Sequence, residues 1–212
     1  MCGIVGYIGD KSAVSVLENG LTRLEYRGYD SAGVAILNGQ GIQMRRTLGK
    51  LQALKNSLAD EPIDGHVGIG HTRWATHGQP SENNSHPHRD ASETVFVCHN
   101  GIIENYGELR AELQNQGIEF RSQTDSEVMP NLIKLAYDKI ENTTGDERLA
   151  TAVRAACARV RGTYAIAVMH ENHPSTLIVA RWKSPLVIGL GKEENVFASD
   201  IPAILNITRR VI

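Results

Sequence analysis

Short apolar runs rich in β-branched residues predict strands in the first half of the chain, at residues 3–8, 31–37, 42–47, 66–71 and 94–99. The stretch "NGQG" after the second run indicates a hairpin, because Asn-Gly pairs favour tight turns between strands. Behind Ser12, a residue type that favours helix N-caps, apolar residues recur at helical spacing as far as Leu24. A second helix is predicted over residues 50–58, ending before Pro62.

The second half of the chain predicts three helices and then four strands. The helices cover residues 106–116, the segment from near Asp125 to Ile140, and residues 146–160. Pro130 inside the second of them predicts a late start or a kink. The strands follow one another after short turns, which is typical of antiparallel sheets, at residues 163–169, 177–181, 186–190 and 195–198. The pattern as a whole predicts an α+β fold in which stacked antiparallel sheets lie between helical layers.

Composition then narrows the class of protein. The chain has 212 residues, of which 41% are hydrophobic, enough for one globular domain. Its 22 basic and 24 acidic residues give a net charge of −2 without a polybasic block, which argues against nucleic-acid or anionic-membrane binding. Three widely spaced cysteines predict no disulfide framework and favour a reducing compartment. Because there is neither a signal-peptide pattern nor an apolar run long enough to span a bilayer, we expect a cytoplasmic protein.

A cysteine, Cys2, stands directly before the first predicted strand. Chain termini are usually frayed, so a thiol held at the start of a buried strand requires an explanation. Histidines also gather in the middle of the chain, and a zinc site is conceivable there; they are His66, His71, His77, His86, His88 and His99. No pair has the helical spacing of a zinc protease and no C-x-x-C occurs, so we expect no metal and no cofactor. His66 and His71, at the ends of a strand, are expected to be packing or capping residues.

The segment "HTRWATHG" (residues 71–78) combines a cation with a large ring. Arg73 offers a five-donor fork that suits a carboxylate, and Trp74 on a polar loop needs a pocket or a moving lid. A structural salt bridge and a surface-packed ring would explain the same residues.

Two further segments allow a functional and a structural interpretation. "HNGIIEN" follows a predicted strand, where Asn-Gly usually forms a turn, but the Asn100 amide and the Gly101 N–H could also converge on an oxyanion. "SQTDSE" places Asp125 where it could be a plain helix N-cap or a lone carboxylate for an ammonium group. Taken together, a terminal thiol, an arginine fork, oxyanion donors and a carboxylate suit hydrolysis of the side-chain amide of an amino acid. Glutamine fits this set.

The chain is similar to the glutaminase domains of the glutamine–fructose-6-phosphate aminotransferase family, a branch of the class II glutamine amidotransferases. The resemblance runs in order through "MCGIVG", "LEYRGYDSAG", "HTRWATHG", "NNSHPH", "HNGIIEN", "TDSE" and "SPLVIGLG". It implies an N-terminal-nucleophile hydrolase fold, a four-layer αββα sandwich of two antiparallel sheets. The sequence departs from the family at Trp182 and Lys183, where small or polar residues are usual.

The resemblance also implies a role for each matched residue. Cys2 matches the nucleophile once Met1 is removed, and Asn100 with Gly101 matches the oxyanion hole. Arg73 matches the binder of the glutamine α-carboxylate, and Asp125 that of its α-ammonium. A loop that closes over glutamine is matched by Trp74, Thr76 and His77, with the Trp implicated in passing ammonia onward. His86 matches a loop histidine to which we assign no role.

The family resemblance implies hydrolysis of L-glutamine to glutamate and ammonia, through a thioester on the N-terminal cysteine. The whole of residues 1–212 would be the glutaminase domain. The sugar-isomerase half of the family, which uses the ammonia to convert fructose 6-phosphate into glucosamine 6-phosphate, does not follow it. Because "ITRRVI" looks like part of another strand, we expect a fragment of a longer protein. The resemblance implies that the full-length enzyme is a homodimer. Two alternatives stay open: a metal-dependent hydrolase built on the histidines, and a regulatory module that senses glutamine without turnover.

Overall fold

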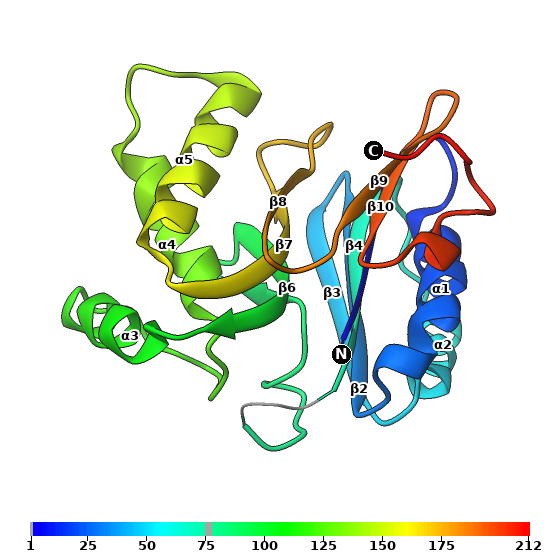
Figure 1. Cartoon of the computed structure of the whole chain (residues 1–212), viewed down its shortest axis with the longest axis horizontal. Helices are drawn as coiled ribbons and strands as arrows, with labels where there is room; N and C mark the ends of the chain where they lie inside the picture. The colour runs from blue at the N-terminus through cyan, green and yellow to red at the C-terminus, as the bar shows by residue number, and fades with distance from the viewer. Residues whose placement is uncertain (1, 75–77) are drawn as a thin grey trace.

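The computed structural model describes residues 2–74 and 78–212, and two antiparallel β-sheets stack face to face at its centre (Figure 1). The first sheet has the strand order β3-β2-β4-β1-β10-β9. Its strands are β1 (Gly3–Ile8), β2 (Ser31–Asn38), β3 (Gly41–Leu48), β4 (Val67–Arg73), β9 (Val187–Leu190) and β10 (Asn195–Ala198). The second sheet has the order β5-β6-β7-β8, with strands β5 (His88–Arg89), β6 (Val95–Ile103), β7 (Gly162–His170) and β8 (Ile178–Trp182). The expected antiparallel pairing is confirmed for the neighbouring strands of both sheets, for example β1 with β4 and β6 with β7.

Helices cover the outer face of each sheet. The first sheet carries α1 (Ala13–Leu24) and α2 (Leu51–Asp60), whereas α3 (Tyr106–Asn115), α4 (Val128–Lys139) and α5 (Gly145–Arg159) lie on the second (Figure 1). Ser12 caps α1 as expected, accepting a hydrogen bond from the Ser15 N–H at 3.5 Å. The predicted four-layer αββα sandwich is therefore confirmed. No helix in the described part of the chain is long and apolar enough to cross a membrane.

The protein has three hydrophobic cores: one between the first sheet and its helices, one between the second sheet and its helices, and one between the two sheets. Because side chains alternate along a strand, the first sheet contributes to two of them. On β1, Val5 and Tyr7 face the helices α1 and α2, while Ile4 faces the other sheet. On β4 and β6, Ile69 and Cys98 likewise point into the layer between the sheets. The same faces continue beyond the apolar residues toward the ends of these strands. Polar residues placed there lie at the rim of the inter-sheet core.

One local expectation needs correction, and the structure decides between the two outcomes predicted for another. The Asn100-Gly101 pair does not form a turn, because β6 continues to Ile103 and Gly101 pairs with Tyr164 of β7. The helix expected from near Asp125 begins at Val128, so Pro130 lies in its first turn. Helix N-termini leave their first N–H groups without intrahelical partners, and a proline is therefore tolerated there. Of the two outcomes predicted from Pro130, the structure has the late start.

The last residues of the sequence extend the first sheet. The backbone N–H and C=O of Ile188 in β9 both bond to Ile212, at 2.9 and 2.8 Å. A single antiparallel bridge also joins Gly189 to Val211. The segment "ITRRVI" therefore pairs with the edge strand β9 through its last residues but does not form the full strand that its sequence suggested.

Candidate active site

One cavity, of about 270 Å³, opens at the rim of the inter-sheet core. Six residues to which the resemblance assigns a role line it: Cys2, Arg73, Trp74, Asn100, Gly101 and Asp125. They come from the start of β1, the end of β4, the second half of β6 and the loop before α4. The fold therefore brings together residues that are up to 123 positions apart in the sequence. Thr76 and His77 lie outside the described residues.

The Cys2 backbone is held by two side chains. Its carbonyl oxygen accepts hydrogen bonds from Asn100 Nδ2 at 2.9 Å and from Arg27 Nε at 3.2 Å. Arg27 is buried and is itself fixed by an ion pair to Asp200, with 2.9 Å between Nη1 and Oδ2. A terminus that would otherwise fray is thereby anchored at the cavity.

The thiol of Cys2 faces competing electrostatic influences. Burial raises its pKa, because a thiolate is poorly solvated there. The Trp74 backbone N–H, which donates to Sγ at 3.1 Å, and the Arg73 cation both act in the opposite direction. Burial prevails, so the neutral thiol is favoured and an added base is needed to generate the nucleophile.

Arg73 ends β4 and is 4% exposed. Its Nη2 donates to the Gly78 carbonyl oxygen at 3.3 Å. Burial lowers the pKa of this guanidinium, whereas the neighbouring Cys2, Asp30 and Asp125 groups favour its charged form. A fork-shaped cation held in a cavity in this way is suited to a carboxylate ligand.

Asp125 is 5% exposed and does not cap α4, whose N-cap residue is Glu127. One carboxylate oxygen accepts a hydrogen bond from the Ile103 N–H at 2.8 Å. The surrounding loop is kept compact by Glu127, whose carboxylate accepts from the Arg121 and Ser122 N–H groups at 2.8 and 2.7 Å. The plain N-cap interpretation is therefore wrong, and Asp125 presents a fixed negative charge at the cavity.

Gly101 adopts a backbone conformation that other residues avoid. Its φ is +142°, and a Cβ at this position would lie 2.0 Å from the Thr163 carbonyl oxygen. The glycine thus lets β6 pass close to β7 beside the cavity. Trp74 lies at the mouth, 45% exposed, with its ring packed edge-on against Tyr29 at a centroid distance of 5.3 Å.

Four of the histidines, His71, His86, His88 and His99, lie together at this cavity. His66 lies before the opposite end of β4, and His77 lies outside the described residues. The rings of His71 and His86 stack at 4.2 Å between centroids, and His88 packs edge-on against His86 at 4.5 Å. Several of their ring nitrogens bond to protein groups, for example His88 Nε2 with Thr124 Oγ1 at 2.9 Å and His99 Nδ1 with Ser126 Oγ at 2.8 Å. In the described residues no group of three or more His, Cys, Asp or Glu is arranged to hold a metal ion. The cluster is built as a packed support.

Two residues of the site were not predicted from the sequence: Arg27, which holds the Cys2 carbonyl, and His71 as a partner of Asn100. Arg27 lies in "LEYRGYDSAG", and its contact with Cys2 spans 25 positions, which no local pattern encodes. His71 was expected to be a packing or capping residue, yet its Nε2 lies 2.9 Å from Asn100 Oδ1. The available signal was its spacing of two from Arg73, which puts both side chains on one face of the strand.

Comparison with known proteins agrees with this geometry. A family model described as a glutamine amidotransferase domain matches residues 71–206. The chain belongs to this family. A glutamine–fructose-6-phosphate aminotransferase (isomerizing) of Symbiobacterium thermophilum is 56% identical over the whole chain, and one of Clostridium perfringens is 53% identical. The chain spans 34% and 33% of the length of these relatives, about a third.

The fold of this glutamine amidotransferase domain is shared with solved structures. Glutamine phosphoribosylpyrophosphate amidotransferase of B. subtilis superposes with a TM-score of 0.80 at 28% identity, covering 98% of this chain and 44% of that one. The family resemblance read from the motifs is confirmed, as is the fold that it implies.

Proposed function

We propose that this domain hydrolyses L-glutamine to glutamate and ammonia through a thioester on Cys2. The observation that carries the proposal is the convergence of a thiol, a buried cation, a buried carboxylate and an Asn-Gly pair on one cavity of about 270 Å³. Glutamine is complementary to this set, since it has a carboxylate, an ammonium group and an amide at fixed separations. Arg73 holds the α-carboxylate and Asp125 the α-ammonium, leaving the side-chain amide for Cys2.

The chemistry follows from these positions. Cys2 Sγ attacks the amide carbon, and the resulting oxyanion accepts hydrogen bonds from the Asn100 amide and the Gly101 N–H. An amide nitrogen carries two hydrogens, so Asn100 Nδ2 can hold the Cys2 carbonyl with one and serve the oxyanion with the other. Collapse of the intermediate breaks the C–N bond, a proton passes to the departing ammonia, and water then hydrolyses the thioester.

The base in this scheme is the α-amine of Cys2 after removal of Met1. A terminal amine has a reference pKa of about 7.7–8.0, so it is partly neutral at physiological pH. Burial raises the pKa of the Cys2 thiol, so the thiol needs a base. The neutral amine can accept the thiol proton and later donate a proton to the departing ammonia. Behind Met1 the same nitrogen is an amide and has no basicity. The position of Cys2 next to the start of the chain is explained by this requirement.

The test compares processed protein with protein that retains Met1, each verified by intact mass. Processed protein should release glutamate, with kcat/KM rising as the pH climbs through the pKa of the amine, because only the neutral amine accepts a proton. Protein retaining Met1 should fold equally well but lose about 10²–10⁴ in rate, the usual contribution of a general base. Equal rates would show that the amine is not the base, and His77 or His99 would have to be tested. A chain that binds glutamine without releasing glutamate would instead be a sensor.

The full-length relatives suggest where the ammonia goes. We propose that residues 1–212 are the glutaminase domain of a longer homodimeric enzyme, and that its sugar-isomerase domain uses the ammonia to convert fructose 6-phosphate into glucosamine 6-phosphate. Three free cysteines, Cys2, Cys98 and Cys157, support a reducing compartment such as the cytoplasm.

A further inference from the structure

We propose that His71 is the positioning residue that fixes the orientation of the Asn100 amide in the oxyanion hole. The proposal rests on the proposed glutaminase function and deepens it, since it names a residue that acts through an oxyanion donor without touching the substrate. It is carried by hydrogen bonds that run from β4 of the first sheet to β6 of the second and on to Cys2.

Strand alternation explains why the two side chains meet. On β4, Ile69 packs in the layer between the sheets, and His71 lies two residues farther along the same face. On β6, Cys98 packs in that layer and Asn100 lies two residues farther along. Both polar residues therefore lie where the apolar inter-sheet core ends. His71 is 1% exposed, so its polar atoms must find partners within the protein.

The contacts of His71 determine which ring nitrogen carries the proton. Its Nε2 lies 3.2 Å from the backbone carbonyl oxygen of His99 and 2.9 Å from the side chain of Asn100. A carbonyl oxygen can only accept, so Nε2 must be the protonated nitrogen. The Asn100 atom that faces the same N–H must then be its oxygen, and the amide nitrogen is left to face Cys2 O at 2.9 Å. The His71 tautomer thereby fixes the orientation of the amide.

The other ring nitrogen supports the same tautomer. Nδ1 of His71 has no hydrogen-bond partner among the described residues. A buried acceptor without a partner is tolerated better than a buried N–H without one. Burial lowers the pKa of His71 to about 3, so the ring is neutral at physiological pH and carries only the Nε2 proton.

A second histidine holds the ring in place. The His86 ring stacks on His71 with 18° between their planes, and its Nδ1 accepts a hydrogen bond from the His99 N–H at 3.2 Å. The backbone of His99 thus bonds to both rings, through its carbonyl oxygen to His71 and through its N–H to His86. This arrangement restricts His71 to one position beneath Asn100.

The orientation matters because an asparagine amide has two nearly equivalent settings related by a half-turn of its terminal torsion. In one setting an N–H is available to the oxyanion; in the other the amide oxygen faces it and repels it. Two described contacts favour the first setting: the Nε2–H of His71 donates to the Asn100 oxygen, and the Cys2 carbonyl accepts from the amide nitrogen. Loss of His71 leaves the oxygen without its donor and weakens this selection. Loss of His71 should therefore reduce kcat and leave KM for glutamine nearly unchanged.

The experiment compares two substitutions of similar polarity in the processed protein. His71→Gln places a side-chain N–H near the position of Nε2, whereas His71→Asn reaches only to the position of Nδ1. We expect His71→Asn to lower kcat by at least about tenfold, but by no more than the roughly 10²–10³-fold loss caused by removing an oxyanion donor. We expect His71→Gln to retain most of the wild-type kcat. His170→Asn is the matched control, because His170 is a buried histidine, with one unpartnered ring nitrogen, outside this cavity. It should keep the wild-type kcat.

Combination with Asn100→Ala separates this proposal from the proposed function. If His71 acts through Asn100, His71→Asn should have little further effect on kcat in the Asn100→Ala background. Full additivity, or a His71→Asn protein with wild-type kcat, would overturn the positioning role while leaving the glutaminase assignment intact. Wild-type kcat in Asn100→Ala alone would overturn the oxyanion hole and this proposal with it. Should the His71 variants fail to fold, NMR of the histidine ring nitrogens in the wild-type protein decides, since a proton on Nδ1 of His71 would contradict the proposal.

Discussion

At the scale of single residues, Arg73 and Asp125 are two opposite charges in one cavity, with exposures of only 4% and 5%. Buried charges are costly unless they are compensated, and a zwitterionic ligand compensates both at once. Removing either partner leaves the matching ligand charge without its counter-charge in a closed site. We therefore predict that Arg73→Ala lowers kcat/KM by about 2–4 kcal/mol of transition-state stabilisation.

Arg73→Lys refines this prediction, because it retains the charge and removes the fork. A lysine offers a point charge in place of two parallel N–H donors, so the substitution should also impair turnover. Arg45→Lys is a matched control, since Arg45 pairs with Glu61 at the protein surface, away from the cavity. Steady-state kinetics over a range of glutamine concentrations measure both effects. Wild-type efficiency in Arg73→Ala would refute the assignment of Arg73 to the α-carboxylate.

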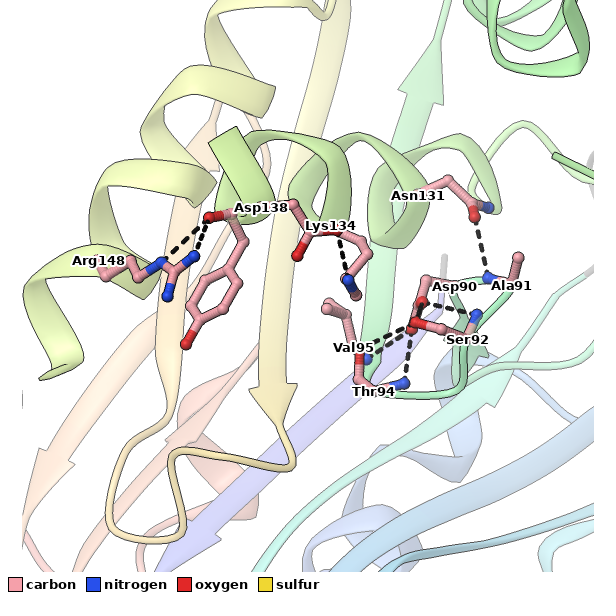
Figure 2. Close-up of polar contacts among 10 residues, drawn as sticks. Asp90, Ala91, Ser92, Thr94, Val95, Asn131, Lys134, Asp138 and Arg148 are labelled. Atoms are coloured by element: carbon pink, nitrogen blue, oxygen red, sulfur yellow. Dashed lines mark hydrogen bonds and ion pairs between the residues drawn. The ribbon is translucent and has the colours of Figure 1, made fainter. Parts of the chain in front are cut away.

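At the scale of elements, β6 depends on the turn that precedes it. Asp90 is 1% exposed, and one of its carboxylate oxygens accepts from the Thr94 and Val95 N–H groups, both at 2.7 Å (Figure 2). Ser92 donates to the other oxygen through its N–H at 2.8 Å, and Asn131 of α4 accepts from the Ala91 N–H at 3.1 Å. The turn thus fixes the start of the strand that carries Asn100 and ties it to α4.

We predict that Asp90→Ala lowers the free energy of unfolding by about 2–4 kcal/mol, because one buried and two partly buried N–H groups lose their acceptor. The matched control is Asp138→Ala. Asp138 pairs with Lys134 on the exposed side of α4, in the same view of Figure 2, and exposed ion pairs of this kind contribute about 0.2–0.5 kcal/mol. Urea denaturation of both variants measures the difference. Equal stabilities would show that the Asp90 contacts do not hold the turn.

The strands and helices could be predicted from sequence because each depends on local periodicity. The N-cap at Ser12 and the late start at Pro130 are of this kind. The continuation of β6 through Asn100 and Gly101 could not be predicted in the same way. Asn-Gly favours a turn locally, and only the pairing of Gly101 with Tyr164, 63 positions away, outweighs that preference.

The candidate site was partly predictable for a related reason. Residue types with distinctive chemistry, such as the thiol of Cys2 and the fork of Arg73, can be recognised singly in the sequence. Residues that act on their neighbours cannot. Arg27 is one arginine among many until its contact with the Cys2 carbonyl is seen, and His71 was one of six clustered histidines. Contacts between distant strands carry this information, and no pattern in one segment contains it.

At the scale of the whole molecule, the site is divided between the two sheets. Arg73 ends β4 of the first sheet and Cys2 directly precedes β1 of the same sheet, whereas Asn100 and Gly101 belong to β6 of the second sheet. Asp125 enters from the loop before α4. The inter-sheet core, which includes Ile4, Ile69 and Cys98, sets the separation of the two halves of the site. The two-sheet sandwich is therefore what places the nucleophile opposite the oxyanion donors.

The cavity itself limits what this chain can catalyse alone. Its described charged lining residues are Arg27, Arg73 and Asp125, besides the thiol and the histidines. Arg27 is committed to Asp200 and the Cys2 carbonyl, and the other two suit the α-groups of one amino acid. No described cationic lining residue is then left to hold a sugar phosphate. The acceptor site of the relatives should lie in the two thirds of their length that this chain does not match.

We therefore predict that purified protein from which Met1 has been removed produces glutamate and free ammonia in equal amounts from glutamine, and no glucosamine 6-phosphate when fructose 6-phosphate is added. Chromatographic analysis of sugar phosphates, with an ammonia assay on the same samples, provides the measurement. Cys2→Ala is the control, because it removes the nucleophile and should abolish release of both products. Fructose 6-phosphate should leave the rate of glutamate release unchanged, since no site for it is expected in this domain. Amino sugar formed by the isolated chain would place an acceptor site within these residues and overturn the proposed domain boundary.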